Sequence, residues 1–214
     1  MDVFLITPTY EWQFAPQVED ADFTKIAKKA GLSPEVARLL FERGIQDQES
    51  LKKFLEPSLE DLHDPYLLHD MDKAVERIRQ AIEEGENILV YGDYDADGMT
   101  SASIVKESLE QLGAECRVYL PNRFTDGYGP NASVYKYFID QEGISLIVTV
   151  DNGVAGHEAI ELAQSMGVDV IVTDHHSIPE TLPDAYAIVH PEHPDANYPF
   201  KYLAGCGVAF KLAC

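Results

Sequence analysis

The sequence is poor in cysteine and has no long hydrophobic run. Its 214 residues include three cysteines, and none of them stands in a CxxC pair: Cys116, Cys206 and Cys214. An odd number of widely spaced cysteines offers no disulfide framework, which favours a reducing compartment. No apolar run approaches the roughly 20 residues of a membrane-spanning helix, and the first residues lack the basic start of a secretion signal. We therefore expect a cytoplasmic protein with no membrane partner.

Basic residues are also scarce. The chain has 16 Lys and Arg against 37 Asp and Glu, which gives a formal net charge of −21. Such a balance argues against a protein that binds nucleic-acid phosphates through a basic stripe alone. It is compatible with an acidic cluster that binds divalent cations, because bound metal ions can be the largest local charges in a site. A metal site would then lie where acidic residues gather.

The pattern of hydrophobic residues changes near residue 70. Residues 1–70 contain amphipathic stretches at 23–31, 33–44 and 48–57, which predict a small helical segment. Residues 71–214 alternate short apolar runs with amphipathic stretches, which predicts an α/β domain with a parallel β-sheet flanked by helices. The expected strands cover 86–92, 115–121, 145–150, 168–173 and 185–191. The expected helices cover 71–85, 99–113, 131–143, 155–167 and 207–214.

Three of the expected strands end in acidic residues. In chain order these residues are Asp93, Asp95 and Asp97, then Asp151, then Asp174 with His175 and His176. Sites in open parallel sheets form outside the carboxyl ends of the strands, so the five carboxylates and two imidazoles should meet at one edge. Carboxylates packed so closely repel one another, and divalent cations offset that repulsion. A ligand set of carboxylate and imidazole without thiolate suits Mn²⁺ or Mg²⁺ better than structural zinc.

Other interpretations of these residues are weaker. An EF-hand loop that began at Asp93 would need a glutamate at its twelfth position, where the sequence has Ile104. A turn of Asp93, Asp95 and Asp97 that only caps the next helix would leave the other two acidic strand ends unexplained. A dinucleotide site is excluded because no GxGxxG follows the strand 86–92. The cysteines have the character of small core residues, not of nucleophiles.

Three motifs contain the acidic strand ends: GDYDADGMTS at 92–101, TVDNG at 149–153 and TDHHS at 173–177. Together they resemble the successive signatures of the DHH phosphoesterase family. The blocks at 120–131 and 198–214 narrow the resemblance to single-strand-specific exonucleases of that family. The resemblance implies a two-metal centre that holds two Mn²⁺ or Mg²⁺ ions, with the metal ligands Asp93, Asp95, Asp97, Asp151 as the bridging carboxylate, and His175. It also implies that His176 faces the scissile phosphate and that Asp174 orients the neighbouring imidazole.

The segments beside these motifs offer groups for a phosphate. Arg123 is one of two arginines after residue 85 and stands beside a glycine-rich loop, so we expect it to clamp a phosphate. Gly205 and Gly207 allow close backbone approach, and amides near the start of the helix 207–214 are a further candidate phosphate site.

The resemblance implies a 5′→3′ exonuclease that hydrolyses single-stranded DNA to mononucleotides in DNA repair and recombination. Single-stranded DNA is then the main partner, and a single-strand-binding protein and a helicase are further expected partners. Two alternatives stay open: a DHH phosphodiesterase for cyclic dinucleotides or short oligoribonucleotides, and a non-catalytic DHH scaffold in a replication complex. The family has a further metal-binding aspartate after the DHH motif that this chain lacks. We therefore expect an incomplete DHH domain at 71–214, truncated at its C-terminus, with weak or no activity alone.

Overall fold

The computed structural model describes residues 21–214, which divide between Leu62 and His63 into two compact units. The part of the expected helical segment that precedes residue 21 lies outside the described residues. Residues 63–70, which the sequence pattern places in the helical segment, belong to the larger unit. Leu68 accounts for this boundary, because its side chain is buried in the core of the larger unit.

The smaller unit is helical, as the sequence predicts. It contains α1 (Ala21–Lys29), α2 (Pro34–Glu42), α3 (Gln48–Leu55) and the short 3-10 helix η1 (Leu59–Asp61). Helix α2 begins after Ser33, whose side chain accepts a hydrogen bond from the amide of Val36, and Pro34 takes the first helical position. Helix α3 begins at a capping box formed by Asp47 and Ser50. A small core joins the three helices through Phe23, Ala27, Ala37, Leu40 and Leu51.

The larger unit alternates strands and helices. Its first half contains η2 (Pro65–Leu67), α4 (Met71–Glu84), β1 (Asn87–Tyr91), α5 (Ala96–Gln111) and β2 (Cys116–Tyr119). Its second half contains α6 (Ala132–Glu142), β3 (Ile144–Val150), α7 (His157–Ser165), β4 (Asp169–Thr173), β5 (Ala187–Val189) and α8 (Gly205–Ala213). The expected five strands are therefore present, although β5 is much shorter than the run 185–191 suggested.

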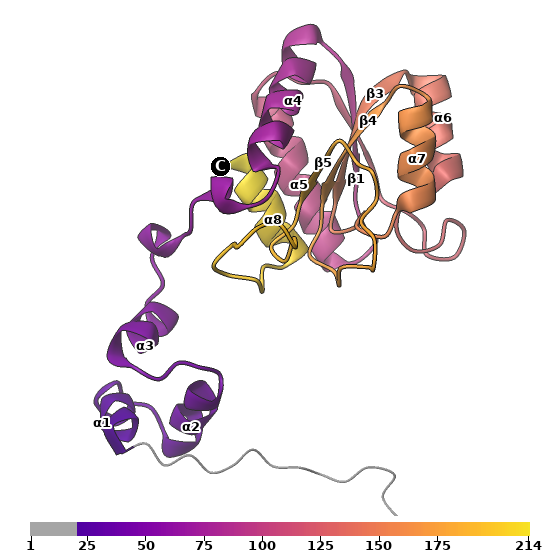
Figure 1. Ribbon diagram of the computed structural model, residues 1–214. Helices are drawn as coiled ribbons and strands as arrows, with labels where there is room; N and C mark the ends of the chain where they lie inside the picture. The colour runs from indigo at the N-terminus through magenta and orange to yellow at the C-terminus, as the bar shows by residue number, and fades with distance from the viewer. Residues whose placement is uncertain (1–20) are drawn as a thin grey trace, which may run out of the picture. The chain divides into compact units, whose positions relative to one another are not determined.

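The five strands form one parallel sheet in the order β2-β1-β3-β4-β5. Helices α4, α5 and α8 cover one face, and α6 and α7 cover the other (Figure 1). Alternate residues of each strand enter the two cores, as Ile88 and Leu89 of β1 show. The expected parallel sheet flanked by helices is thus confirmed. Along the chain, β1 is followed by β2, which pairs with one side of β1, and then by β3, which pairs with the other side. The direction in which successive strands are added to the sheet therefore reverses between β1 and β3. Ligands bind at such a switch point in open α/β sheets.

An ion-pair network fastens the amino-terminal edge of the sheet. Arg77 of α4, with only 8% of its side chain exposed, donates two hydrogen bonds of 2.8 Å to Glu86 and one of 2.6 Å to Asp169. The Ser145 hydroxyl donates to the same Glu86 carboxylate. The network therefore ties α4 to the starts of three strands, at the end of the sheet opposite the acidic residues.

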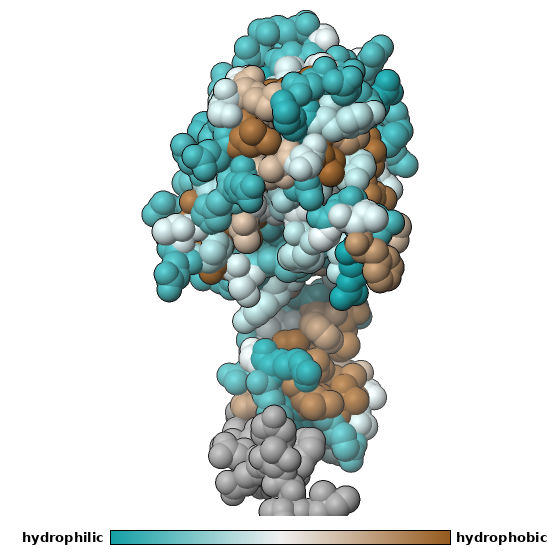
Figure 2. Space-filling model, turned by 90° about the vertical axis from the view of Figure 1, so that its right-hand side faces the viewer, coloured by the Kyte–Doolittle hydropathy of each residue, from teal (hydrophilic) through white to brown (hydrophobic). Residues whose placement is uncertain are grey.

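The surface is largely hydrophilic where Figure 2 shows the larger unit, and hydrophobic residues appear there in separate patches. Between residues 21 and 214, every helix is too short or too polar to cross a lipid bilayer.

Candidate metal centre

The carboxyl edge of the sheet gathers the predicted acidic strand ends. Asp93 and Asp95 follow β1, Asp151 follows β3, and His175 and His176 come shortly after β4. Their ligand atoms form two overlapping sets that could each hold a metal ion: Asp93, Asp95 and Asp151 in one, and Asp151, His175 and His176 in the other. Asp151 belongs to both sets, which is the position that the resemblance assigned to a bridging carboxylate. The site lies beside the switch point between β1 and β3.

Asp151 has an unusual environment. It is 1% exposed, and its backbone adopts the left-handed region with a φ of 61°, which is rare for a residue other than glycine. Its Oδ1 accepts no hydrogen bond, although His175 Nε2 lies 3.0 Å away. Burial, together with the nearby carboxylates of Asp97 and Asp95, raises the pKa of Asp151 to about 7. A buried carboxylate oxygen that faces an imidazole nitrogen without a hydrogen bond is suited to sharing a cation with it.

The turn between β1 and α5 holds the first acidic residues. Asp95 caps α5, because its Oδ1 accepts hydrogen bonds from the amides of Asp97 at 2.9 Å and Gly98 at 3.0 Å. The capping interpretation therefore describes Asp95 correctly, and Asp95 still belongs to a candidate metal-ligand set. Asp93 is 3% exposed, and burial raises its pKa. Gly98 permits this tight turn, since a Cβ there would lie 2.5 Å from the amide nitrogen of Asp93.

Asp97 joins the site to the last helix. Its carboxylate accepts hydrogen bonds from the amides of Gly205 at 2.7 Å and Cys206 at 2.8 Å, at the first turn of α8. Burial opposes the ionisation of Asp97, but these amides outweigh it, so the pKa of Asp97 is lowered. Asp97 Oδ2 also lies 3.5 Å from His175 Nε2. Among the described residues Asp97 falls in neither ligand set, and its role as a metal ligand stays a prediction.

Asp174 organises the turn that carries the two histidines. Its Oδ1 accepts hydrogen bonds from the amides of His175 and His176 and from Nδ1 of the His176 ring, the last at 2.8 Å. Its Oδ2 accepts the amide of Val154 at 2.9 Å. Asp174 therefore holds the proton of His176 on Nδ1 and leaves Nε2 on the outer side of the ring. The same hydrogen bond to Asp174 raises the pKa of His176.

Arg123 lies in an aromatic setting at this edge. Its guanidinium stands over the ring of Tyr94, with Cζ 5.5 Å from the ring centroid, and the side chain is exposed. The ring of Tyr128 meets His176 edge to face, with centroids 6.0 Å apart. Burial and then the charge of Asp93 raise the pKa of Tyr128 to about 12. The sequence drew attention to the glycines of this loop but not to Tyr128, whose position beside His176 depends on contacts between distant segments.

The two glycines expected to bind phosphate have other partners here. The Gly205 amide donates to Asp97, and the Gly207 amide donates to the carbonyl of Ala204 at 2.9 Å. Gly205 lies so close to Asp151 that a Cβ on it would be 2.7 Å from the Asp151 Cβ. Its lack of a side chain is thus required for packing against the metal centre, and the phosphate contact stays a prediction.

The residues of the site fit divalent metal ions. The donors are carboxylate oxygens and imidazole nitrogens, the combination that Mn²⁺ and related ions accept. The hydrogen-bond requirement of Asp151 Oδ1 is unmet by protein atoms. Four neighbouring aspartates repel one another, and a bound cation would relieve that repulsion.

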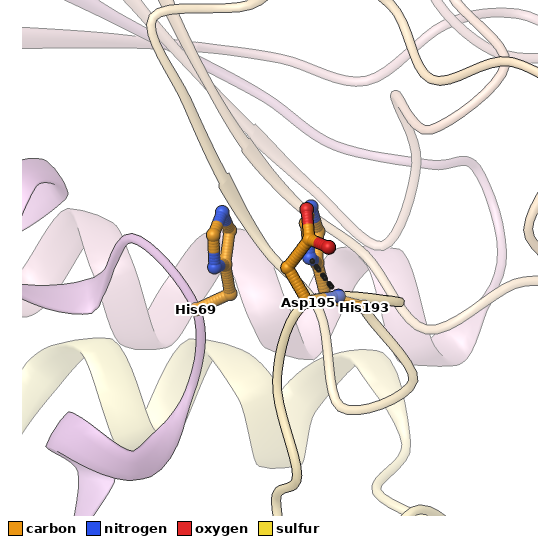
Figure 3. Close-up of side chains that lie close together, drawn as sticks. All are labelled: His69, His193 and Asp195. Atoms are coloured by element: carbon orange, nitrogen blue, oxygen red, sulfur yellow. Dashed lines mark hydrogen bonds between the residues drawn. The ribbon is translucent and has the colours of Figure 1, made fainter.

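A further cluster, His69, His193 and Asp195, lies near the end of β5 (Figure 3). The two imidazole rings stack with centroids 3.7 Å apart and planes inclined by 11°. The Asp195 amide donates to His193 Nδ1 at 3.2 Å, which leaves the proton of the neutral ring on Nε2. Parallel rings also direct their nitrogen lone pairs side by side instead of toward a common point. This geometry favours a packing contact over a metal site.

The model of the DHH family, N-terminal domain, matches residues 87–214, which include every strand of the sheet and the whole of the acidic edge. The chain therefore belongs to the DHH family.

Among individual proteins the chain is similar to RecJ. It is 44% identical over 210 residues to the single-stranded-DNA-specific exonuclease RecJ of Bacillus subtilis, covering 98% of this chain and 26% of that protein. It is also 44% identical over 188 residues to RecJ of Escherichia coli, covering 86% of this chain and 31% of that protein. The chain thus spans about a quarter to a third of the length of these curated relatives.

Solved RecJ structures share the fold. A RecJ exonuclease bound to manganese matches with a TM-score of 0.62 and 36% identity, over 68% of this chain and 37% of that one. RecJ from Thermus thermophilus in complex with Mn²⁺ matches with a TM-score of 0.66 and 31% identity, over 90% of this chain and 26% of that one.

Proposed function

We propose that this chain carries the metal centre of a RecJ-like exonuclease that hydrolyses single-stranded DNA from 5′ to 3′ and releases mononucleotides. The observation that carries the proposal is Asp151, a buried carboxylate whose Oδ1 accepts no hydrogen bond and which belongs to two candidate ligand sets. The similarity to RecJ over nearly the whole chain supports the choice of substrate. The cellular role would be DNA repair and recombination.

Two divalent ions, Mn²⁺ or Mg²⁺, would be held by Asp93, Asp95, Asp151 and His175, with Asp97 as the remaining predicted ligand. RecJ structures with manganese and magnesium support this choice of ions. Ions held there would supply the Lewis acidity needed to activate a water molecule and to stabilise the leaving oxygen of an in-line displacement.

The remaining residues would orient the phosphodiester. His176 presents Nε2 away from Asp174, so a phosphate oxygen beside the metal ligands would meet this nitrogen. Asp174 keeps that ring in a single tautomer and orientation. Arg123 would bind a phosphate of the same strand through its exposed guanidinium. Gly205 and Gly207, in the first turn of α8, would allow the strand to approach the backbone there.

Single-stranded DNA is the proposed partner. A single-strand-binding protein and a helicase are further predicted partners, and the cytoplasm is the predicted location. The excess of acidic residues argues against a basic DNA-holding surface within this chain, so the strand would depend on the metal centre and Arg123 for its contacts here.

Hydrolysis of a labelled strand tests the function. The protein in its full natural length is incubated with Mn²⁺ and with a long single strand, the matching duplex, or a cyclic dinucleotide. We expect degradation of the single strand in preference to both others, and loss of that activity in Asp151→Ala. Asp140→Ala, which removes an exposed carboxylate paired with Lys136 away from the site, serves as the control. Preference for the dinucleotide would favour a phosphodiesterase, and an inactive protein that binds no Mn²⁺ would favour a scaffold.

A further inference from the structure

His190 is a buried histidine directly after β5. It has 0% of its surface exposed, and both of its ring nitrogens have partners. Nε2 lies 2.8 Å from the carbonyl oxygen of His176, and Nδ1 accepts a hydrogen bond of 3.0 Å from the amide of Glu192. Neither the acidic strand ends nor the family motifs drew attention to this residue.

The two contacts define the protonation state of His190. An amide can only donate, so Nδ1 is the acceptor and carries no proton. A carbonyl oxygen can only accept, so Nε2 carries the proton and donates a hydrogen bond to the carbonyl oxygen of His176. Only the neutral ring with its proton on Nε2 satisfies both partners. Burial also lowers the pKa of His190, which agrees with a neutral ring.

The contact continues the pairing between β4 and β5 beyond the end of the strands. Thr173 is the last residue of β4 in register with β5, where it pairs with Val189, and the amide of Asp174 then donates to the carbonyl of Val189 at 3.2 Å. The next contact between these two segments involves a side chain: the His190 ring donates a hydrogen bond to the carbonyl oxygen of His176. The turn that carries the histidines is thus anchored on β5.

The backbone of His176 is consequently held on both sides. Asp174 Oδ1 accepts its amide at 3.1 Å, and His190 donates to its carbonyl. Fixing both peptide groups of one residue fixes the direction of its Cα–Cβ bond, and the hydrogen bond from Nδ1 to Asp174 then fixes the ring. We propose that His190 is a positioning residue, whose Nε2–H holds the backbone carbonyl of His176 and thereby aims the His176 imidazole at the substrate phosphate. This role rests on the proposed function.

A matched pair of variants separates the two hydrogen bonds of His190. The side-chain amide of glutamine reaches the place of Nε2 and can still donate to His176, whereas the shorter asparagine reaches the place of Nδ1 and leaves the His176 carbonyl without its donor. In full-length protein acting on a single strand, we expect His190→Gln to keep kcat within about threefold and His190→Asn to lower kcat by about 10–100-fold. KM and Mn²⁺ affinity should change little in both, since His190 contacts neither substrate nor the predicted metal ligands. Equal kcat values for the two variants would overturn the proposal.

Nitrogen NMR of the histidine rings in the 214-residue chain gives a readout that is independent of activity. In the wild-type chain we expect the His190 ring to show a protonated Nε2 and an unprotonated Nδ1, and His176 to show a single ring environment. His190→Gln should preserve the His176 signals, and His190→Asn should shift or broaden them. A wild-type His190 protonated on Nδ1, or His176 signals unchanged in His190→Asn, would overturn the positioning role whether or not the protein is a nuclease. A wild-type full-length protein without nuclease activity would instead overturn the proposed function.

Discussion

Gly205 packs directly against Asp151, so that a Cβ at Gly205 would lie 2.7 Å from the Cβ of Asp151. Non-bonded carbon atoms do not approach so closely, and the neighbour in question is buried and held in a left-handed backbone conformation. The start of α8 and the carboxylate shared by the two ligand sets are therefore in direct van der Waals contact. A change in one must displace the other.

Substitution of Gly205 should therefore weaken metal binding. Gly205→Ala would push Asp151 from its position, and we expect Mn²⁺ affinity to fall by about tenfold or more, as measured by calorimetry. Gly207→Ala, one half-turn further along α8, is the control, because its Cβ would meet the flexible end of Leu203 at 3.2 Å. Similar affinities for the two variants would show that this contact does not position the carboxylate.

The pKa of Asp151 predicts a pH-dependent loss of stability in the metal-free protein. The folded-state pKa is about 7, whereas an aspartate in the unfolded chain titrates near 3.9. Between these pH values the folded state binds more protons than the unfolded state. The stability that protonated Asp151 contributes is therefore present at low pH and is lost as pH rises to about 7.

Asp151→Asn removes this titration. In EDTA at pH 8 the variant should melt above wild type, by about 2–4 °C for each 1 kcal/mol gained in free energy of unfolding. Added Mn²⁺ should stabilise wild type and not the variant. Melting curves with the same pH dependence in both proteins would contradict the assignment.

The Arg77 network should contribute strongly to stability. Arg77→Met leaves the carboxylate of Glu86, itself 15% exposed, without its bidentate partner at the base of the sheet. We expect the free energy of unfolding in urea to fall by about 3–5 kcal/mol. Arg117→Met is the comparison, since Arg117 is 70% exposed in its ion pair with Glu142 and such surface pairs contribute about 1 kcal/mol or less. Equal losses would show that burial of the pair is not what makes it stabilising.

Arg123 should affect substrate binding more than metal binding. We expect Arg123→Ala to raise KM for a single strand by about tenfold. Mn²⁺ affinity should stay unchanged, since the guanidinium stands over the ring of Tyr94 and contacts none of the predicted metal ligands. Arg79→Ala, which removes an exposed arginine of α4, controls for the loss of one positive charge. A rise in KM of the same size in both variants would indicate a general charge effect. An unchanged KM in Arg123→Ala would exclude the phosphate clamp.

Much of the acidic edge could be predicted because it follows from local patterns. Apolar runs marked the strands, and acids that follow such runs meet at the carboxyl edge of any parallel sheet. The start of α5 was less accurate: the sequence suggested Met99, and the helix begins at Ala96 because Asp95 caps it. Gly98 lies in this first turn, where its lack of a side chain lets the turn close on Asp93.

The contacts that hold the site together could not be predicted in the same way. Asp97 has the same sequence context as its neighbours, yet its carboxylate is directed at amides on α8. His190 follows a predicted strand, but no periodicity distinguishes an imidazole that supports His176 from one that packs against core residues. Such assignments depend on which segments become neighbours in three dimensions. A single sequence contains that information only through the whole fold.

The pairing of Asp97 with Gly205 joins residues 108 positions apart. A chain that leaves the ribosome from its amino terminus releases all three acidic strand ends before helix α8 appears. Until α8 docks, Asp97 lacks the amides that favour its ionised form, and Asp151 lacks the glycine that closes over it. The nascent chain therefore cannot make these contacts of the metal centre before α8 has left the ribosome.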